Sequence, residues 1–235
     1  MRPRHVMVID PAMHTPELDC FNRMATVAEL PLTYHLPAMH GLGSIQRDEA
    51  NLAGVIVLGS ASSVNDQLPW QAELGAWLDK RMRDGVPTLG LCFGHQLIGA
   101  LFGARCDFLF PDHHKLSGFA PVQLAANSLW GDGGTRQLFQ SHREVMVDCP
   151  AELVVTAQRP DVPNDGYAHR ELPIWTFQTH PEATAEFLAN RGEPAEEPAR
   201  FADGHAIVDR FLALTALPDS RSRGSASAAG DPRTR

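Results

Sequence analysis

The 235-residue sequence lacks any apolar run near the roughly 18 residues that a membrane-spanning helix needs, so we expect no membrane partner. Its first residues also lack the apolar stretch of a secretory signal peptide, because two arginines lead directly into a short strand-like run. Cysteine is scarce: the four present show no CxxC or CxxH spacing, which favours free thiols over disulfides or a zinc site. Together these absences predict a cytoplasmic protein without a bound metal.

The chain also has no excess of positive charge. It contains 20 Lys and Arg residues against 28 Asp and Glu residues, which gives a formal net charge of −8 at pH 7. General nucleic-acid binders usually carry positive charge, so we expect no nucleic-acid partner. Residues 218–235 have no large apolar side chain and are expected to be a disordered tail. Residues 1–217 are enough for a single α/β domain with a buried core.

Short strand-like runs alternate with helical patterns in the first half of the chain. Apolar runs at 5–10, 54–60 and 88–92 are typical of strands, and a weaker run lies at 32–38. Thr15 is the expected N-terminal cap of the first helix. This alternation predicts a mostly parallel, twisted central sheet flanked by helices on both faces, as in flavodoxin-like folds.

The second half of the chain has a different pattern, because its strand candidates lie close together. This crowding predicts a small antiparallel extension of the sheet, followed by helices near 182–191 and 204–217. The strand candidates are 119–125, 136–147, 152–159 and 173–180.

Cys92 stands where the run TLGLC (88–92) ends and a helical pattern begins, with Gly90 and Gly94 two residues away on either side. This is the G-x-nucleophile-x-G pattern of a nucleophile elbow, in which a strand turns abruptly into a helix. The turn would lift the sulfur to the carboxyl edge of the sheet, where ligands of such folds bind. The helix N-terminus would favour the thiolate, and the backbone N–H of Phe93 would serve as an oxyanion donor.

A nucleophilic thiol needs a base, and the base needs a group that orients it. The segment WTFQTHPE supplies both at the end of an apolar run, as His180 and Glu182. Residues i and i+2 of an extended segment face the same way. Glu182 can therefore hold one ring nitrogen of His180 while the other faces the thiol of Cys92.

Other reactive side chains favour ordinary roles. Cys20, Cys106 and Cys149 lack a glycine frame, and we interpret them as small core residues. The histidine pair in PDHHKLSG (111–118) suggests a metal site, but adjacent histidines on a loop point in different directions. We expect this segment to be a solvated or lid-like loop near the active site.

The ordered pair GLCFGHQL (90–97) and QTHPE (178–182) resembles the class I, triad-type glutamine amidotransferases. The resemblance extends over roughly residues 5–190 and is greatest to the stand-alone branch similar to the glutaminase domain of GMP synthase. It implies that Cys92 attacks the side-chain amide of glutamine, that His180 is base and acid, and that Glu182 orients it. A γ-glutamyl thioester would form and be hydrolysed to glutamate, with release of ammonia and without a metal or organic cofactor.

Further residues are assigned by the same resemblance. Gln96 matches the family position that contacts bound glutamine, and Ser141 and His142 match the segment along its α-amino and α-carboxyl ends. Gly59 or Ser60 would supply the second oxyanion N–H. The sequence departs from the family at Gly59-Ser60-Ala61, where relatives often have Gly-Gly-Pro, at Arg143-Glu144, where they often have Gly-Asp, and at Thr179, where an aromatic residue is common.

The resemblance leaves the biological role open between three alternatives. In the first, the protein delivers ammonia to a separate synthetase in trans, since the residues after 217 leave no room for a synthetase domain. In the second, the same triad acts as a hydrolase or peptidase on another γ-glutamyl amide. In the third, the chain is a non-catalytic regulatory relative, which would not need the complete set of Cys92, His180 and Glu182.

Overall fold

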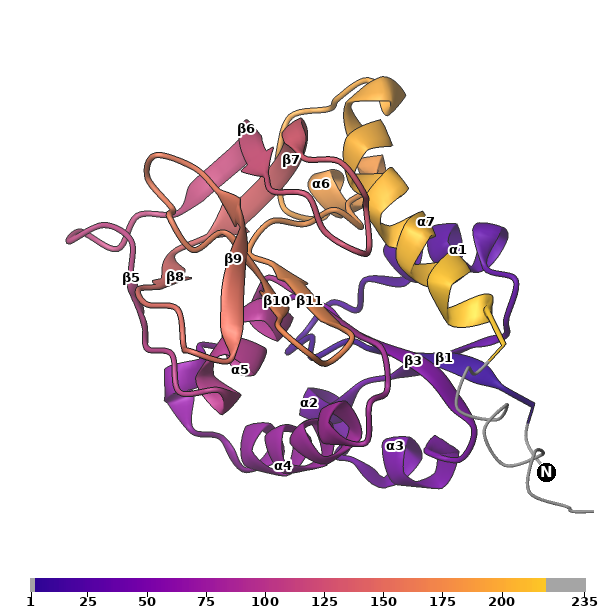
Figure 1. The fold of residues 1–235 in the computed structure, drawn as a ribbon. Coiled ribbons are helices and arrows are strands. Elements are labelled where there is room, and N and C mark those ends of the chain that lie inside the picture. Colours follow the sequence, from indigo (N-terminus) through magenta and orange to yellow (C-terminus); the bar gives the residue numbers. More distant parts are fainter. Residues whose placement is uncertain (1–2, 219–235) are drawn as a thin grey trace, which may run out of the picture.

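The computed structural model describes residues 3–218, which form a twisted sheet with helices on both faces (Figure 1). The nine strands of this sheet lie in the order β2-β1-β3-β4-β11-β10-β9-β6-β7. Residues 219–235 of the expected tail lie outside the described residues. No helix within 3–218 is both long enough and apolar enough to cross a membrane.

The first half of the sheet is parallel, as predicted. Strands β2, β1, β3, β4 and β11 pair in register through parallel ladders. The strands are β1 (His5–Ile9), β2 (Leu32–His35), β3 (Leu52–Val57), β4 (Thr88–Leu91) and β11 (Ile174–Phe177). Because parallel strands end at the same edge, the residues that follow β3, β4 and β11 are brought together there.

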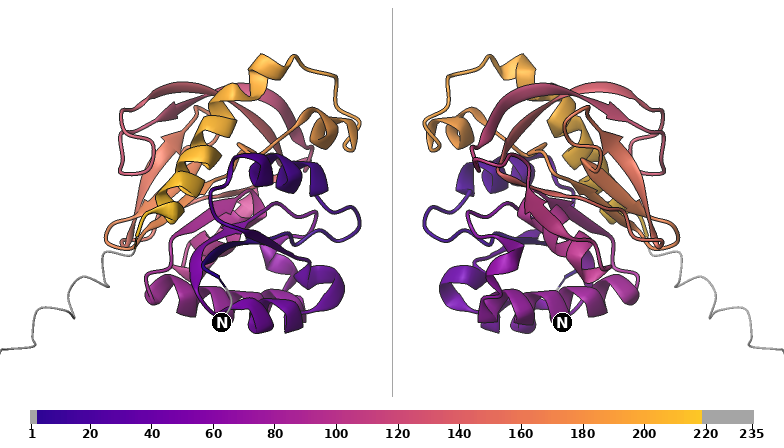
Figure 2. Two further views of the ribbon diagram at one scale, coloured as in Figure 1. Left: turned by 90° about the vertical axis from the view of Figure 1, so that its right-hand side faces the viewer. Right: turned by 90° about the vertical axis from the view of Figure 1, so that its left-hand side faces the viewer.

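Helices cover both faces of this parallel half (Figure 2). Val6 and Val8 of β1 pack in a core with α1 and α7, whereas Met7 and Ile9 point to the other face, toward α3, α4 and α5. The helices are α1 (Leu18–Val27), α2 (Pro37–His40), α3 (Gly43–Asp48), α4 (Pro69–Arg83), α5 (Phe93–Leu101), α6 (Ala185–Ala189) and α7 (Ala202–Ala216), with 3₁₀ turns at η1 (Val64–Asp66) and η2 (Pro198–Phe201). The layered arrangement confirms the predicted α/β fold class.

The predicted cap of the first helix is wrong: α1 begins at Leu18, and Glu17 occupies the cap position without a capping hydrogen bond from its side chain. Asp10, at the end of β1, accounts for the later start. Its carboxylate accepts hydrogen bonds from the backbone N–H of Ala12 (2.9 Å) and of Glu17 (2.7 Å). The segment between them is thereby held in a loop rather than a helical turn.

The sheet continues into an antiparallel extension on the far side of β11. The ladders from β11 through β10, β9 and β6 to β7 are all antiparallel. A separate two-stranded sheet is made by β5 and β8. The bounds are β5 (Cys106–Phe108), β6 (Leu116–Leu124), β7 (Gly134–His142), β8 (Glu144–Met146), β9 (Leu153–Gln158) and β10 (Gly166–His169).

Candidate active site

Cys92 lies at the sharp turn between β4 and α5. Its N–H donates to the carbonyl of Phe177 (2.8 Å), which extends the β4–β11 ladder, and its carbonyl accepts from Gln96 N (3.1 Å), which begins the helix. To satisfy both, Cys92 adopts φ 50° and ψ −100°, a strained conformation for a residue with a β-carbon. The elbow expected from the sequence is therefore present at Cys92.

The glycines on either side of Cys92 are required by close backbone contacts. A β-carbon at Gly94 would lie 2.4 Å from the carbonyl oxygen of Val57 in β3. A β-carbon at Gly90 would lie 2.7 Å from the carbonyl oxygen of Gly94 itself. Both distances are far below van der Waals contact, so any larger residue would displace the turn that carries the thiol.

His180 and Glu182 follow β11 and are buried beside this turn. The Nδ1 of His180 lies 2.8 Å from Oε1 of Glu182, and its backbone N–H donates to the carbonyl of Phe139 (2.7 Å). A β-carbon at Gly59 would lie 2.8 Å from Cε1 of His180 and 3.6 Å from Cβ of Cys92. The loop after β3 therefore touches both side chains, which border one cavity of about 520 Å³.

Burial determines the protonation of these three groups. It raises the pKa of Cys92 to about 12, with Glu182 and Glu17 adding to the rise, while Arg191 and the N–H of Phe93 oppose it. Burial lowers the pKa of His180 well below its usual value and raises the pKa of Glu182 to about 8. Burial thus opposes the thiolate expected from the helix N-terminus and favours a neutral thiol beside a neutral imidazole.

A chain of side-chain amides, which sequence reasoning missed, leads to the sulfur of Cys92. Gln96 donates from Nε2 to the carbonyl of Glu144 (3.0 Å) and to Oε1 of Gln178 (3.1 Å). Gln178, which is fully buried, points its own Nε2 at Sγ of Cys92 (3.7 Å). The backbone carbonyl can only accept, so it fixes the orientation of both amides and makes Gln178 a donor to the sulfur. The signal in the sequence was the position of Gln178 two residues before His180.

The residues expected to bind substrate line the same cavity, namely Gln96, Ser141 and His142. The Nε2 of His142 accepts from Nη2 of Arg159 (3.2 Å), whose Nε is paired with Asp165 (2.8 Å). Burial, followed by the charge of Arg159, lowers the pKa of His142 to about 3. His142 is therefore expected to be neutral, and its ring is held by the buried Arg159–Asp165 ion pair. No sequence motif indicated this pair.

The expected oxyanion groups come from the start of α5 and from the loop after β3. Phe93 is the first residue of α5, and its N–H is directed at the thiol. Ser60 donates from Oγ to the carbonyl of Pro11 (2.7 Å) and accepts from the N–H of Ser62 (3.1 Å). These bonds fix the course of the loop although the sequence has serine and alanine where relatives often have glycine and proline.

The remaining cysteines and the segment 111–118 differ from expectation: residues 111–115 form a loop, but residues 116–118 already belong to β6. Cys20 is buried as expected, but Cys106 is half-buried and Cys149 is exposed, so the interpretation of these two as core residues is wrong. In the loop, the ring of His113 stacks on Phe108 (3.6 Å between centroids). Within residues 3–218, no cluster of three or more His, Cys, Asp or Glu side chains is arranged to hold a metal ion.

Comparison with known proteins gives one family. Residues 26–189 match the sequence profile of the class I glutamine amidotransferases. A glutamine-hydrolysing GMP synthase subunit from Methanopyrus kandleri is 31% identical over 109 residues, which cover 41% of this chain and 52% of that protein. The corresponding GMP synthase subunit from Thermoplasma acidophilum is 25% identical over 132 residues, covering 56% of this chain and 64% of that protein. This chain therefore spans about half the length of the first relative and somewhat more of the second.

Solved structures give the same fold. A glutamine amidotransferase from Thermotoga maritima superposes with a TM-score of 0.70 at 15% identity, covering 92% of this chain and all of that one. At this level of identity the likeness concerns the fold. Its extent shows that the antiparallel extension belongs to the same architecture as the parallel half.

Proposed function

This chain belongs to the class I glutamine amidotransferase family, and from that premise we propose that it hydrolyses the side-chain amide of glutamine to glutamate and ammonia. The observation that carries the proposal is the meeting of Cys92, the His180–Glu182 pair and Gly59 at one edge of the sheet. The family assignment alone supports the type of reaction. This arrangement also allows a residue to be assigned to each step of it.

In the proposed mechanism the proton of the Cys92 thiol passes to Nε2 of His180 as the sulfur attacks the γ-carbonyl carbon of glutamine. The backbone N–H of Phe93 and that of Gly59 or Ser60 hold the developing oxyanion. The C–N bond then breaks, the nitrogen takes the proton from His180, and ammonia leaves a γ-glutamyl thioester. His180 next removes a proton from water, which attacks the thioester carbonyl. The C–S bond breaks, the sulfur takes the proton back from His180, and glutamate leaves the regenerated thiol.

The direct test is release of glutamate and ammonia by the purified chain supplied with glutamine. Equal amounts of the two products are expected, either from the chain alone or only when a partner is added. We propose that the ammonia passes to a separate synthetase in trans, because the names of the relatives describe a glutamine-hydrolysing subunit. Glutaminase activity that appears only after a cell extract is added would support transfer of ammonia to a separate synthetase. Absence of glutaminase activity under both conditions contradicts the proposed function.

We expect Gln178 to hold the sulfur for attack and to stabilise the negative charge that develops on it as its proton is transferred. Gln178→Met keeps the length of the side chain but removes the N–H that points at Sγ, and hydrogen bonds to charged groups contribute about 1.5–3 kcal/mol. The variant should lose about tenfold or more in kcat with little change in KM. Alkylation of Cys92 by iodoacetamide should also require a higher pH in the variant than in the wild type to reach the same rate.

The matched control is Gln123→Met on an exposed position of β6, which should leave both measurements unchanged. If Gln178→Met alkylates with the wild-type pH profile, the amide has no role at the sulfur.

The pH dependence should follow the carboxyl of Glu182. Its pKa of about 8 means that the His180–Glu182 pair loses a proton as the pH rises through this value. Only the ionised carboxylate accepts the Nδ1 proton and leaves Nε2 of His180 free to take the proton of the thiol. We expect kcat/KM to rise between about pH 6.5 and 9 with an apparent pKa near 8. Glu182→Gln should be slower and lose this rise, while a flat wild-type profile would exclude the assignment.

A further inference from the structure

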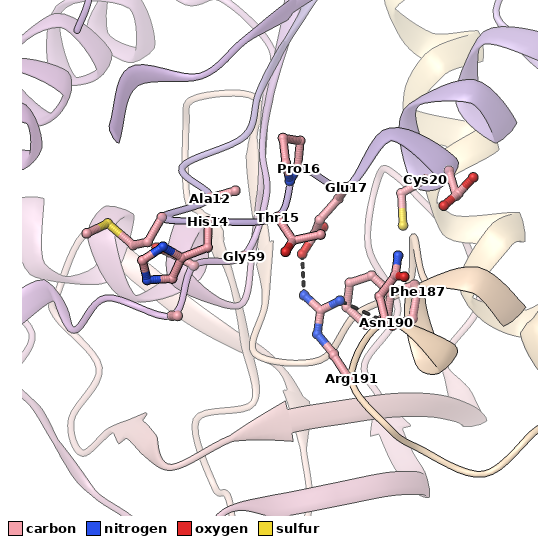
Figure 3. A pocket seen from close by; sticks show the side chains of 14 residues that line it. Ala12, His14, Thr15, Pro16, Glu17, Cys20, Gly59, Phe187, Asn190 and Arg191 are labelled. Carbon is pink, nitrogen blue, oxygen red and sulfur yellow. Dashed lines mark hydrogen bonds and ion pairs between the residues drawn. The ribbon is translucent and has the colours of Figure 1, made fainter. Parts of the chain in front are cut away.

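A second cavity, of about 220 Å³, lies on the other side of the loop that follows β3 (Figure 3). We call it the amine-side cavity. It is enclosed by residues 12–20, by the loop 59–61 and by the end of α6 with the residues after it. Ser60, Ala61 and Arg191 border both this cavity and the one that contains Cys92. The two cavities are therefore neighbours that share a wall.

The ring of His180 packs against residues that line the amine-side cavity. In the proposed reaction the departing nitrogen takes its proton from His180. Phe187 packs on the ring of His180 (4.9 Å between centroids), and Gly59 touches the same ring. Both of these residues line the amine-side cavity. Cys92, His180 and the expected glutamyl-binding residues all line the main cavity and not the amine-side cavity. Arg191 borders both cavities, so a group that leaves beside His180 has this cation in the wall of the same cavity.

Arg191 places a cation at the amine-side cavity, and several of its N–H groups are not used in hydrogen bonds with the described residues. Its guanidinium stacks on the ring of Phe187 (3.4 Å) and donates to Oε1 of Glu17 (2.5 Å) and to the carbonyl of Phe187 (3.3 Å). These bonds use two of the five N–H groups of an arginine, and the others have no acceptor among residues 3–218. Figure 3 shows the guanidinium between Glu17 and Phe187.

Glu17 only partly balances this cation. The carboxyl is buried, and its second oxygen, Oε2, has no hydrogen-bond partner among the described residues. Burial raises the pKa of Glu17 well above its usual value, with the charge of Glu182 adding to the rise and that of Arg191 opposing it. A departing ammonia molecule, about the size of a water, needs neither this space nor this charge. A departing amino acid needs both.

Resting on the proposed function, we propose that the site also cleaves γ-glutamyl amides of amino acids, with the carboxylate of the leaving amino acid bound by Arg191. The chemistry is that of glutamine hydrolysis: the C–S bond to Cys92 forms, the C–N bond breaks, and the nitrogen takes the proton held by His180. The free amino acid leaves, and water converts the thioester to glutamate. No further reactant is needed.

Three substrates test this proposal on the wild-type protein: glutamine, γ-glutamylglycine and γ-glutamylglycinamide, which has nearly the same size but no carboxylate. We expect kcat/KM for γ-glutamylglycine to exceed that for the glycinamide by about tenfold or more, as for a charge-assisted hydrogen bond. If glutamine is hydrolysed but the two glycine compounds have equal kcat/KM, or neither is cleaved, the inference is overturned. The proposed function would still stand. Cleavage of none of the three overturns both.

The matched variants are Arg191→Met and Arg200→Met. Arg200 also lies over a phenylalanine ring (4.8 Å) and pairs with a glutamate (3.6 Å), but it borders neither cavity. Arg191→Met should reduce the preference for γ-glutamylglycine to near one, whereas Arg200→Met should keep it. Preference retained in Arg191→Met contradicts the assignment. If Arg191→Met does not fold because Glu17 loses its partner, Glu17→Gln/Arg191→Met removes both, and the wild-type ratio remains decisive.

Discussion

Replacing Cys92 by alanine should abolish glutamine hydrolysis and leave the fold intact. Removing a catalytic nucleophile typically lowers kcat by about 10⁴- to 10⁶-fold, because no other group forms the covalent intermediate. Alanine keeps the β-carbon, so the strained backbone at φ 50° carries the same steric cost in the variant as in the wild type. Glutamate release and thermal unfolding, measured on the same preparation, separate loss of chemistry from loss of structure.

The control for this variant is Cys149→Ala. Cys149 is exposed and borders neither cavity, so its removal should leave both activity and stability unchanged. Cys92→Ala with more than a few per cent of wild-type activity would mean that the reaction does not pass through this sulfur.

Gly94→Ala should destabilise the protein strongly. The added β-carbon would lie 2.4 Å from the carbonyl oxygen of Val57 and 3.0 Å from its Cβ, and β3 is a central strand that is buried on both faces. Overpacking of this kind costs about 3 kcal/mol, which corresponds to a fall in Tm of about 6–12 °C for a domain of this size. Activity should fall further than the remaining folded fraction explains, because the displaced turn carries Cys92.

Gly43→Ala is the matched control, since its β-carbon would meet only the end of the Arg47 side chain at 3.6 Å. Its Tm should stay within about 2 °C of wild type or rise slightly, as glycine replacements do where the backbone allows alanine. Equal Tm values for the two variants would contradict the close contact between α5 and β3.

The features predicted from the sequence are those set by neighbours along the chain. The elbow at Cys92 was predictable because two glycines, a strand run and a helix run lie close together around it. The contact between His180 and Glu182 was also predicted, and the structure shows a 2.8 Å pair. The expected reason was wrong, because these residues lie in a turn after β11 and not in an extended segment. The parallel order of the strands followed from the alternation of strands and helices.

What sequence reasoning missed depends on contacts between distant segments. The amide of Gln178 points at the sulfur because a carbonyl in β8 orients Gln96, and Arg159 reaches His142 because Asp165 holds it. No local pattern encodes either relation. The late start of the first helix is a more local miss: Asp10, just after β1, accepts hydrogen bonds from the backbone N–H groups of Ala12 and Glu17 and so holds the intervening residues in a loop.

The protonation states of Cys92 and His180 could not be predicted from the sequence either. A thiol at a helix N-terminus favours ionisation, but that expectation takes no account of the burial of Cys92. Because burial raises the pKa of the Cys92 thiol and lowers that of His180, proton transfer accompanies attack in the proposed mechanism and does not precede it. The residues of the elbow therefore predict where the reaction takes place. The protonation states of Cys92 and His180 depend on the tertiary structure.

The most direct test of the central proposal, that Cys92 forms the covalent intermediate, is labelling with a glutamine analogue whose amide is replaced by a diazoketone. Intact mass and peptide mapping then give the number and position of adducts. We expect one adduct per chain, on Cys92, whose formation is slowed by added glutamine. Labelling of the exposed Cys149 instead, or labelling of Cys92 that glutamine does not slow, would contradict the proposed site.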